Sequence, residues 1–216
     1  MHDGAVLSAV LELHIAAGVL ALLLGPAGMI ARKGGVFHRR AGRAYVVAMW
    51  VTCLSAAAYS CLRGTIGMLT VPLPAFVFVV SGDRFAKRRD LEKERRTAIA
   101  LLALGAFVCL VAARRWTQGD EGAGANLPVG IWALACAALD GWRAARGGLV
   151  GAARVAVHRS RMILSYAATV TAFLLTNVRA LPMVLGSFAP TVIALVAIGL
   201  PGLRRPARSA GLQSKS

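Results

Sequence analysis

The chain has 216 residues, of which 57% are hydrophobic and 16% are charged, and its mean hydropathy is +0.65. Soluble globular domains are about half apolar and about a quarter charged, so this composition excludes an ordinary soluble domain and indicates an integral membrane protein. The formal net charge is +16. Its basic residues are confined to short segments between apolar runs, without the interleaved aromatic residues that stack on bases, so we expect no nucleic-acid partner.

The apolar runs predict an all-α fold, a polytopic membrane helix bundle with seven transmembrane helices. The first run has no basic residues before it, so we expect a retained anchor and not a cleaved signal peptide. Pro72 and Pro74 make the third run the weakest of the seven. The bundle forms one domain, residues 1–203, and residues 204–216 form a basic cytoplasmic tail. The predicted spans are residues 5–30, 44–61, 65–82, 97–113, 127–142, 161–180 and 184–203.

Charge distribution supports the weak third span. With seven spans, the segments on one side of the membrane hold 21 of the 25 Lys and Arg residues, and those on the other side hold four. Omitting the third span would move two of the basic loops to the opposite side, against the positive-inside rule. The N-terminus is therefore expected outside and the C-terminus inside. The expected partners are the lipid bilayer and the anionic lipid headgroups at the cytoplasmic Arg and Lys loops; the oligomeric state stays open.

The sixth run carries a polar stripe on an otherwise apolar helix. At 100° per residue, residues 158, 162, 166, 169, 173, 176 and 177 fall within about 100° of arc, and this side should face other helices. In the first run, small residues from Gly18 to Gly28 line one stripe with His14, which predicts a packing seam. The candidate intramembrane polar site comprises His14, Tyr166, Thr169, Asn177 and Arg179.

A second group of polar residues lies at the expected inner face: His38, Arg39, Arg40, Asp140, His158 and Arg159. We expect Asp140 to form a structural ion pair, with Arg143 one helical turn away or with Arg39 or Arg159, in preference to acting as a proton relay. His38 and His158 each precede an arginine at the membrane boundary. Headgroup contact or helix capping is one interpretation of these histidines, and haem ligation is the other.

The sequence contains no nucleotide-binding glycine loop, no H-E-x-x-H and no G-x-S-x-G motif, and its four cysteines have no metal-type spacing. It therefore favours a non-enzymatic membrane component, either a small-solute carrier or an accessory protein, with no metal site and no cofactor. The alternative is a haem-binding transmembrane redox protein of the cytochrome b type. Its axial ligands for haem b would come from His38, His158 or His14.

Two stretches of the sequence carry recognisable motifs, KGG-x-x-HRR-x-GR at residues 33–43 and H-x-x-RM-x-x-x-Y-x-x-x-x-TAF-x-x-x-N at residues 158–177. They resemble a bacterial family of multi-pass membrane proteins known as a domain of unknown function. The resemblance implies a multi-pass protein of the bacterial inner membrane and no particular reaction. The matching positions are His14, Gly18, Gly25, Pro26, Lys33, Gly34, His38, Arg39, Gly42, Arg43, Met49, Ser81, Gly82, His158, Arg161, Met162, Tyr166, Thr171, Ala172, Phe173 and Asn177.

Overall fold

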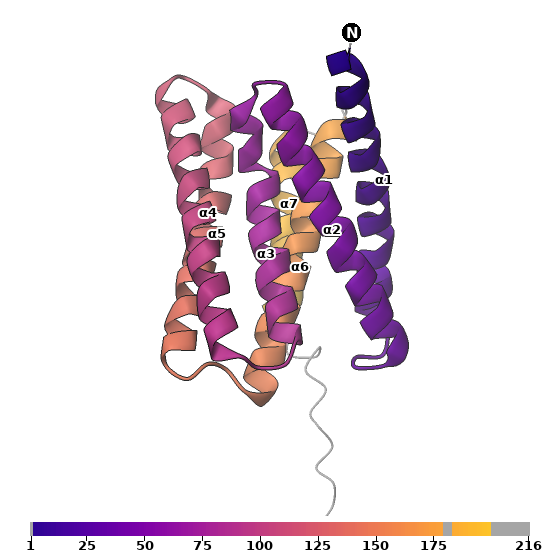
Figure 1. Cartoon of the computed structure of the whole chain (residues 1–216), viewed down its shortest axis with the longest axis vertical. Coiled ribbons are helices and arrows are strands. Elements are labelled where there is room, and N and C mark those ends of the chain that lie inside the picture. The colour runs from indigo at the N-terminus through magenta and orange to yellow at the C-terminus, as the bar shows by residue number, and fades with distance from the viewer. Residues whose placement is uncertain (1, 179–182, 200–216) are drawn as a thin grey trace, which may run out of the picture.

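The computed structural model describes residues 2–178 and 183–199, and within these two ranges every regular element is a helix (Figure 1). The all-α fold class is thus confirmed. In chain order the elements are α1 (His2–Ile30), α2 (Val36–Leu62), the 3-10 turn η1 (Ile66–Thr70), α3 (Pro72–Ala86), α4 (Leu91–Thr117), α5 (Glu121–Ala145), α6 (Gly151–Asn177) and α7 (Met183–Gly199).

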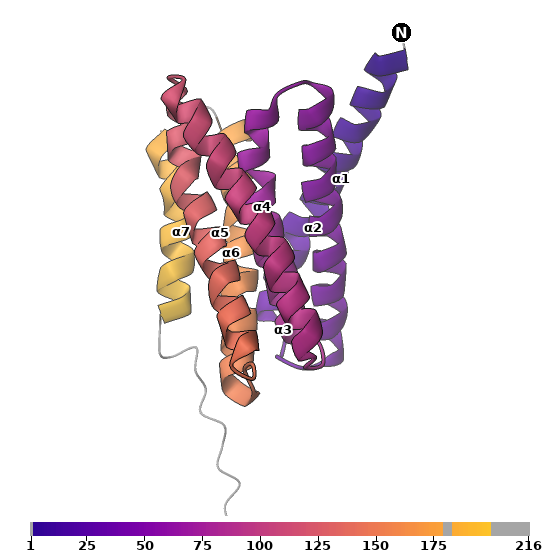
Figure 2. The same ribbon diagram turned by 60° about the vertical axis from the view of Figure 1, so that its left-hand side comes forward.

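The α-helices run alternately up and down, so the α1–α2, α3–α4 and α5–α6 connections meet at one end of the bundle, opposite the N-terminus (Figure 1). We call this end the inner end. Helices α3 and α6 pack together in the middle, with the α1–α2 pair on one side and the α4–α5 pair on the other (Figure 1). Helix α7 packs against α6 at the edge of the bundle away from α1 (Figure 2). This arrangement places residues of α3 and α6 against both outer pairs.

Two apolar clusters reflect this arrangement. One cluster joins α1, α2 and α3 through buried residues that include Ala21, Met49 and Val79, and Met162 and Tyr166 of α6 pack against it. The second joins α3 to α5 and α6, and includes Phe78 and Leu164. Buried alanines allow the backbones to approach closely, as the predicted packing seam on the first run requires.

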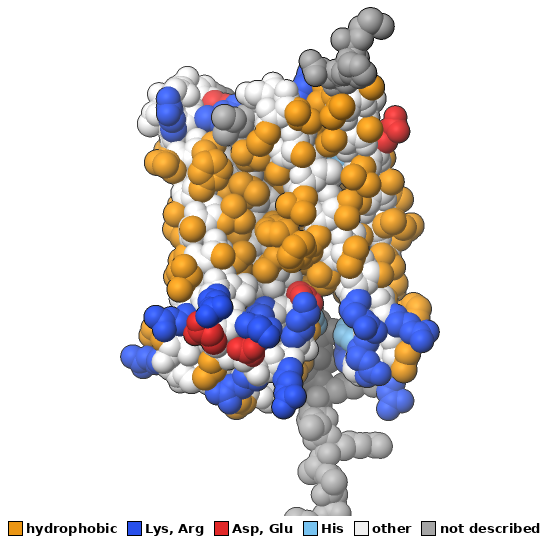
Figure 3. Space-filling view, viewed as in Figure 1, with side chains coloured by type: hydrophobic (Ala, Val, Ile, Leu, Met, Phe, Trp, Pro, Cys, Tyr) orange, Lys and Arg blue, Asp and Glu red, His pale blue; other side chains and the backbone are white. Residues whose placement is uncertain are grey.

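Four of the helical stretches are long and apolar enough to cross a membrane: Gly4–Ile30, Val36–Leu62, Met68–Ala86 and Leu91–Thr117. Many of their large apolar side chains are exposed, for example Leu23, Val47 and Leu110. Apolar side chains cover the middle of the molecule, and most Lys and Arg side chains lie in a band at the inner end (Figure 3). A surface of this kind is stable against lipid and not against water. The structure thus indicates a membrane protein.

Helix boundaries differ from the predicted spans where charged residues extend a helix beyond the apolar run. Helix α4 begins at Leu91, because the carboxylate of Asp90 caps it by accepting a hydrogen bond from the Lys93 backbone N–H at 3.0 Å. It ends at Thr117, and α5 begins at Glu121, so both helices extend into residues 114–126, between the predicted fourth and fifth spans. The third run is divided between η1 and α3, and Pro72 occupies the first turn of α3, where proline is tolerated. The predicted tail, residues 204–216, lies outside the described residues.

Candidate functional site

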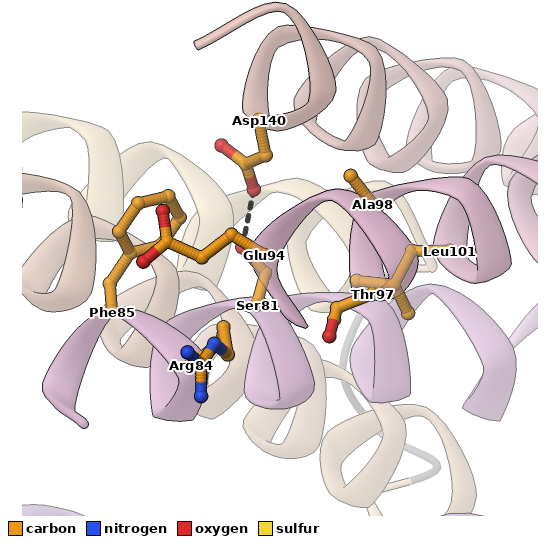
Figure 4. A pocket seen from close by; sticks show the side chains of 8 residues that line it. All are labelled: Ser81, Arg84, Phe85, Glu94, Thr97, Ala98, Leu101 and Asp140. Carbon is orange, nitrogen blue, oxygen red and sulfur yellow. Dashed lines mark hydrogen bonds between the residues drawn. The ribbon is translucent and has the colours of Figure 1, made fainter. Parts of the chain in front are cut away.

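A buried carboxylate, Asp140 on α5, organises the inner half of the bundle. Its Oδ2 accepts a hydrogen bond of 2.5 Å from Ser81 Oγ on α3 (Figure 4), and its Oδ1 lies 3.0 Å from Arg161 Nη2 on α6. Arg143, one turn further along α5, lies 3.4 Å from the same Oδ1. Arg161 also donates to the Cys136 backbone carbonyl at 3.1 Å and contacts the Cys136 thiol. Asp140 therefore connects α5 to the two middle helices, α3 and α6.

A second buried ion pair lies closer to the inner end. Arg154, in the first turn of α6, donates from Nη1 to Glu94 Oε1 on α4 at 2.6 Å. Its Nη2 donates to the backbone carbonyls of Arg84 and Lys87, at the end of α3, at 3.0 and 3.1 Å. The guanidinium also lies over the Phe85 ring, 5.2 Å from its centroid. One arginine thus satisfies two C-terminal carbonyls of α3 and neutralises a carboxylate of α4.

The two buried carboxylates line one small hollow. Ser81, Arg84 and Thr97 complete its polar lining, and Phe85, Ala98 and Leu101 its apolar lining (Figure 4). The space accessible to the centre of a water molecule is about 10 Å³, which is room for about one water. The hollow therefore suits a buried water between the two ion pairs and is too small for an organic solute.

Three histidines hold the same kind of hydrogen bond. The Nδ1 atoms of His14, His38 and His158 lie 3.0, 2.9 and 2.8 Å from the backbone carbonyls of Thr52, Gly28 and Gly82. A carbonyl oxygen can only accept, so in each ring Nδ1 carries a proton, and in the neutral form of such a ring the lone pair is on Nε2. His38 and His158 are half-buried and interact electrostatically with each other.

The polar residues in the middle of α6 bind neighbouring helices one at a time. Ser165 Oγ lies 2.8 Å from the Tyr45 hydroxyl of α2, and Thr169 Oγ1 lies 3.1 Å from Met49 Sδ. The Tyr166 hydroxyl donates to the Leu22 carbonyl of α1 at 3.3 Å. These bonds hold α6 against α1 and α2.

We compared this chain with known proteins. No family model, no curated protein and no solved structure matches it. The candidate site therefore rests on the geometry of the chain itself.

The predicted intramembrane site is not assembled as one cluster. His14, Tyr166 and Thr169 all lie at the contacts of α1, α2 and α6, but each bonds to a different partner. Asn177 is exposed and donates to the Phe173 carbonyl of its own helix at 3.0 Å, so it does not extend the buried face. Arg179 lies outside the described residues.

The predicted inner-face residues fall into two places. The expected pair between Asp140 and Arg143 is confirmed, whereas the alternative pairing of Asp140 with Arg39 or Arg159 is wrong, because Arg161 reaches the carboxylate instead. Arg39 donates to the Gly34 carbonyl at 2.5 Å, and Arg159 donates to the Ile198 carbonyl of α7 at 3.3 Å. Arg40 is exposed, whereas His38 and His158 are half-buried.

Sequence reasoning did not identify Arg161, Arg154 or Glu94 as members of a site. A signal was present on α6: residues 154, 161 and 165 are spaced by seven and four positions, which places them within about 40° of one another at 100° per residue. Arginines that share a helix face with a buried serine are typical of groups that point into a bundle. The partner Glu94 gave no comparable signal, since it lies in a run of charged residues.

Proposed function

We propose that this chain is a multi-pass protein of the bacterial inner membrane that crosses the bilayer seven times, with its N-terminus outside and its C-terminus in the cytoplasm. The band of Lys and Arg at the inner end supports this orientation (Figure 3), because positive residues are retained on the cytoplasmic side. Helices α5, α6 and α7 complete the bundle beside the four strongly apolar stretches. Anionic headgroups then face the basic inner end.

We further propose that the protein is a non-enzymatic membrane component, of the accessory type, whose buried polar residues hold its helices in register. One observation carries this proposal: the buried charges bind one another, Asp140 with Arg161 and Glu94 with Arg154, and each pair joins two different helices. Charges paired in this way specify one helix arrangement and are not presented to a substrate.

Proton flux into liposomes tests the structural role of these pairs against transport. Purified protein is reconstituted with a pH-sensitive dye inside the vesicles, and a membrane potential is imposed with potassium and valinomycin. We expect flux equal to that of protein-free vesicles, for both the unaltered chain and Asp140→Asn. Flux that exceeds the vesicle background and disappears in Asp140→Asn would contradict the accessory role and assign Asp140 to a carrier.

Reporter fusions test the topology independently. Fusions after residues 40, 90, 150 and 210 should report a cytoplasmic position, and fusions after residues 63 and 120 a periplasmic one. The fusion after residue 90 is decisive, because it follows the weak third span. A periplasmic signal there is incompatible with seven spans.

A specific observation favours haem binding as the second candidate function. In His38 and His158, Nδ1 donates to a backbone carbonyl and Nε2 keeps its lone pair, which is the arrangement found in histidines that ligate iron. Two neutral imidazoles on different helices are the usual axial ligands of haem b, and Arg39, Arg40 and Arg159 are the nearby cations suited to its propionates.

Colour separates the two functions. Protein purified from a haem-sufficient host should be colourless, and should stay so after haemin is added, if the accessory role is correct. A Soret band that is lost in His38→Ala or His158→Ala, while the protein stays folded, would establish haem binding instead. His14→Ala is the control. The His14 ring bonds to the Thr52 carbonyl in the middle of α2, far from His38 and His158, so this substitution should leave such a band unchanged.

A further inference from the structure

Four basic side chains from separate parts of the chain meet at the inner end. Helices α1 and α6 are antiparallel and are in close contact at Gly25 and Tyr166, where a side chain on Gly25 would overlap the Tyr166 ring. The residues that follow Gly25 and those that precede Tyr166 therefore continue to the same end of the bundle. His158 is eight residues before Tyr166, about 12 Å along α6, and the α1–α2 connection lies at the corresponding level.

Lys33, on the α1–α2 connection, and His38, in the first turn of α2, share one hydrogen-bond acceptor. Lys33 Nζ lies 3.3 Å from the Gly28 carbonyl oxygen, and His38 Nδ1 lies 2.9 Å from the same oxygen. A single acceptor thus brings the ammonium group and the imidazole ring together at the C-terminal end of α1. Both donors also satisfy a carbonyl that the helix end leaves without an intrahelical partner.

His158 and Arg159 approach this pair from α6. Lys33 interacts electrostatically with both of them, and His38 interacts with His158. Burial, and after it the charge of Arg159, lower the pKa of Lys33. Burial is also the main reason that the pKa of His158 is lowered, and the neighbouring His38 and Lys33 act in the same direction. Arg159 thus makes a positive charge on Lys33 less favourable, and His38 and Lys33 make one on His158 less favourable.

The acidic side chains nearby do not balance this charge. Asp83 is the carboxylate that interacts with His158, and it already forms an ion pair of 2.5 Å with Lys87. In Figure 3 the α1–α2 side of the inner end shows Lys, Arg and His side chains without a red carboxylate among them, whereas blue and red are mixed on the α3–α4 side. Arg159 Nε is buried and has no hydrogen-bond partner among the described residues. A basic cluster with a buried unpaired donor is stabilised by an anion.

We propose that Lys33, His38, His158 and Arg159 bind one phosphate group between the α1–α2 connection and the start of α6. Lys33 and Arg159 supply positive charge. Each histidine can take a proton from solvent on Nε2 and then donate it to a phosphate oxygen, while Nδ1 stays bonded to its carbonyl. The phosphate comes either from the headgroup of an anionic lipid or from a soluble phosphate. The lipid source rests on the proposed membrane orientation, and the site itself does not.

Binding measurements on the full chain in a phosphate-free, uncharged detergent test this proposal. Inorganic phosphate, dioctanoyl phosphatidylglycerol and dioctanoyl phosphatidylcholine are titrated separately, and Kd is obtained by thermophoresis. Lys33→Gln combined with Arg159→Gln should weaken binding of the anion roughly tenfold or more. The matched control is Arg40→Gln combined with Arg43→Gln, which removes the same charge from the same end of the molecule and should change Kd less than about threefold. Lys33→Gln alone alters one residue in the α1–α2 connection, and it replaces the double variant if that one does not fold.

The outcomes decide between the sources and the site. Tighter binding of phosphatidylglycerol than of phosphatidylcholine identifies a lipid headgroup, whereas binding of inorganic phosphate without a lipid preference identifies a soluble ligand. Equal weakening by both double variants would show a diffuse surface potential and overturn the proposal. The proposal would also be overturned if none of the three probes bound. Because these titrations use detergent, they are independent of the reporter fusions, so failure of the topology and failure of the phosphate site are distinguishable.

Discussion

Replacing Asp140 by leucine removes the acceptor that three other side chains share. Arg161 then keeps its positive charge in a buried position, because the side chains of Arg161 and Asp140 are each only 7% exposed in the intact pair. The guanidinium retains only its contacts to Cys136. At 3.0 Å the attraction within the pair is about 5 kcal/mol for an effective dielectric constant of about 20. Since breaking a buried pair from one side leaves an uncompensated charge, we expect Asp140→Leu to lower the free energy of unfolding by about 3 to 5 kcal/mol.

Replacing the partner, Arg161, should lower the free energy of unfolding by less. In Arg161→Met the carboxylate of Asp140 keeps its hydrogen bond from Ser81 and its ion pair with Arg143, so we expect a loss of about 2 to 3 kcal/mol. The double variant replaces both charges by apolar side chains. It should be no less stable than the worse single variant, with a coupling free energy of at least about 2 kcal/mol.

Equilibrium unfolding in mixed micelles, with increasing dodecyl sulfate and far-UV circular dichroism as the signal, measures these differences. The control is the exposed pair Glu92–Arg96 on α4, in which Arg96 Nε lies 2.7 Å from Glu92 Oε1. Glu92→Gln and Arg96→Gln should each change stability by about 0.5 kcal/mol or less. If the losses for Asp140→Leu and Arg161→Met were additive, or no larger than those of the control pair, the buried network would not hold the helices together.

Two further predictions concern packing and pH. Gly25→Ala should destabilise the protein by about 1 to 3 kcal/mol, because the new methyl group overlaps the Tyr166 ring, whereas Gly28→Ala, with nothing within 4 Å, should be neutral or stabilising in the same unfolding titration. Burial lowers the pKa of His158 from its ordinary value of 6.5, so as the pH falls the unfolded chain takes up a proton on this residue before the folded protein does. The contribution of His158 to stability is therefore present above about pH 6.5 and should be lost as the pH falls through the lower pKa of the folded protein. In His158→Gln, melting temperatures measured across this range should depend less on pH, and an unchanged pH dependence would exclude His158 as its source.

The helical fold could be predicted because hydrocarbon leaves the backbone few alternatives. A long apolar run must satisfy its N–H and C=O groups internally, which a helix does. Hydropathy detects the part of a helix in the membrane and not its polar extension, so the start of α4 at Leu91 and its end at Thr117 were missed. The start was nonetheless present in the sequence as Asp90 followed by Glu92 and Glu94, a capping residue and two acids in the first turn.

The candidate site could be predicted only where it is local. The Asp140–Arg143 pair spans three residues on one helix, so helical geometry alone gives it. Arg161 is 21 residues from Asp140, and this pair depends on how α5 and α6 pack. The prediction that the polar stripe on α6 faces other helices was wrong at Asn177 for a related reason. Helical periodicity gives the angles between residues, but it does not give the side that neighbouring helices cover.

The contacts of Arg154 also constrain the order in which the bundle can be completed during synthesis. Glu94 precedes its partner by 60 residues, and the α3 carbonyls that Arg154 satisfies precede it by 67 and 70. At about 5 to 20 residues per second, the ribosome needs roughly 3 to 12 s to make the intervening chain. During that interval α3 and α4 are already synthesised while the carboxylate between them has no arginine from α6. Helices α3 and α4 must therefore wait for α6 before this contact between their inner ends can form.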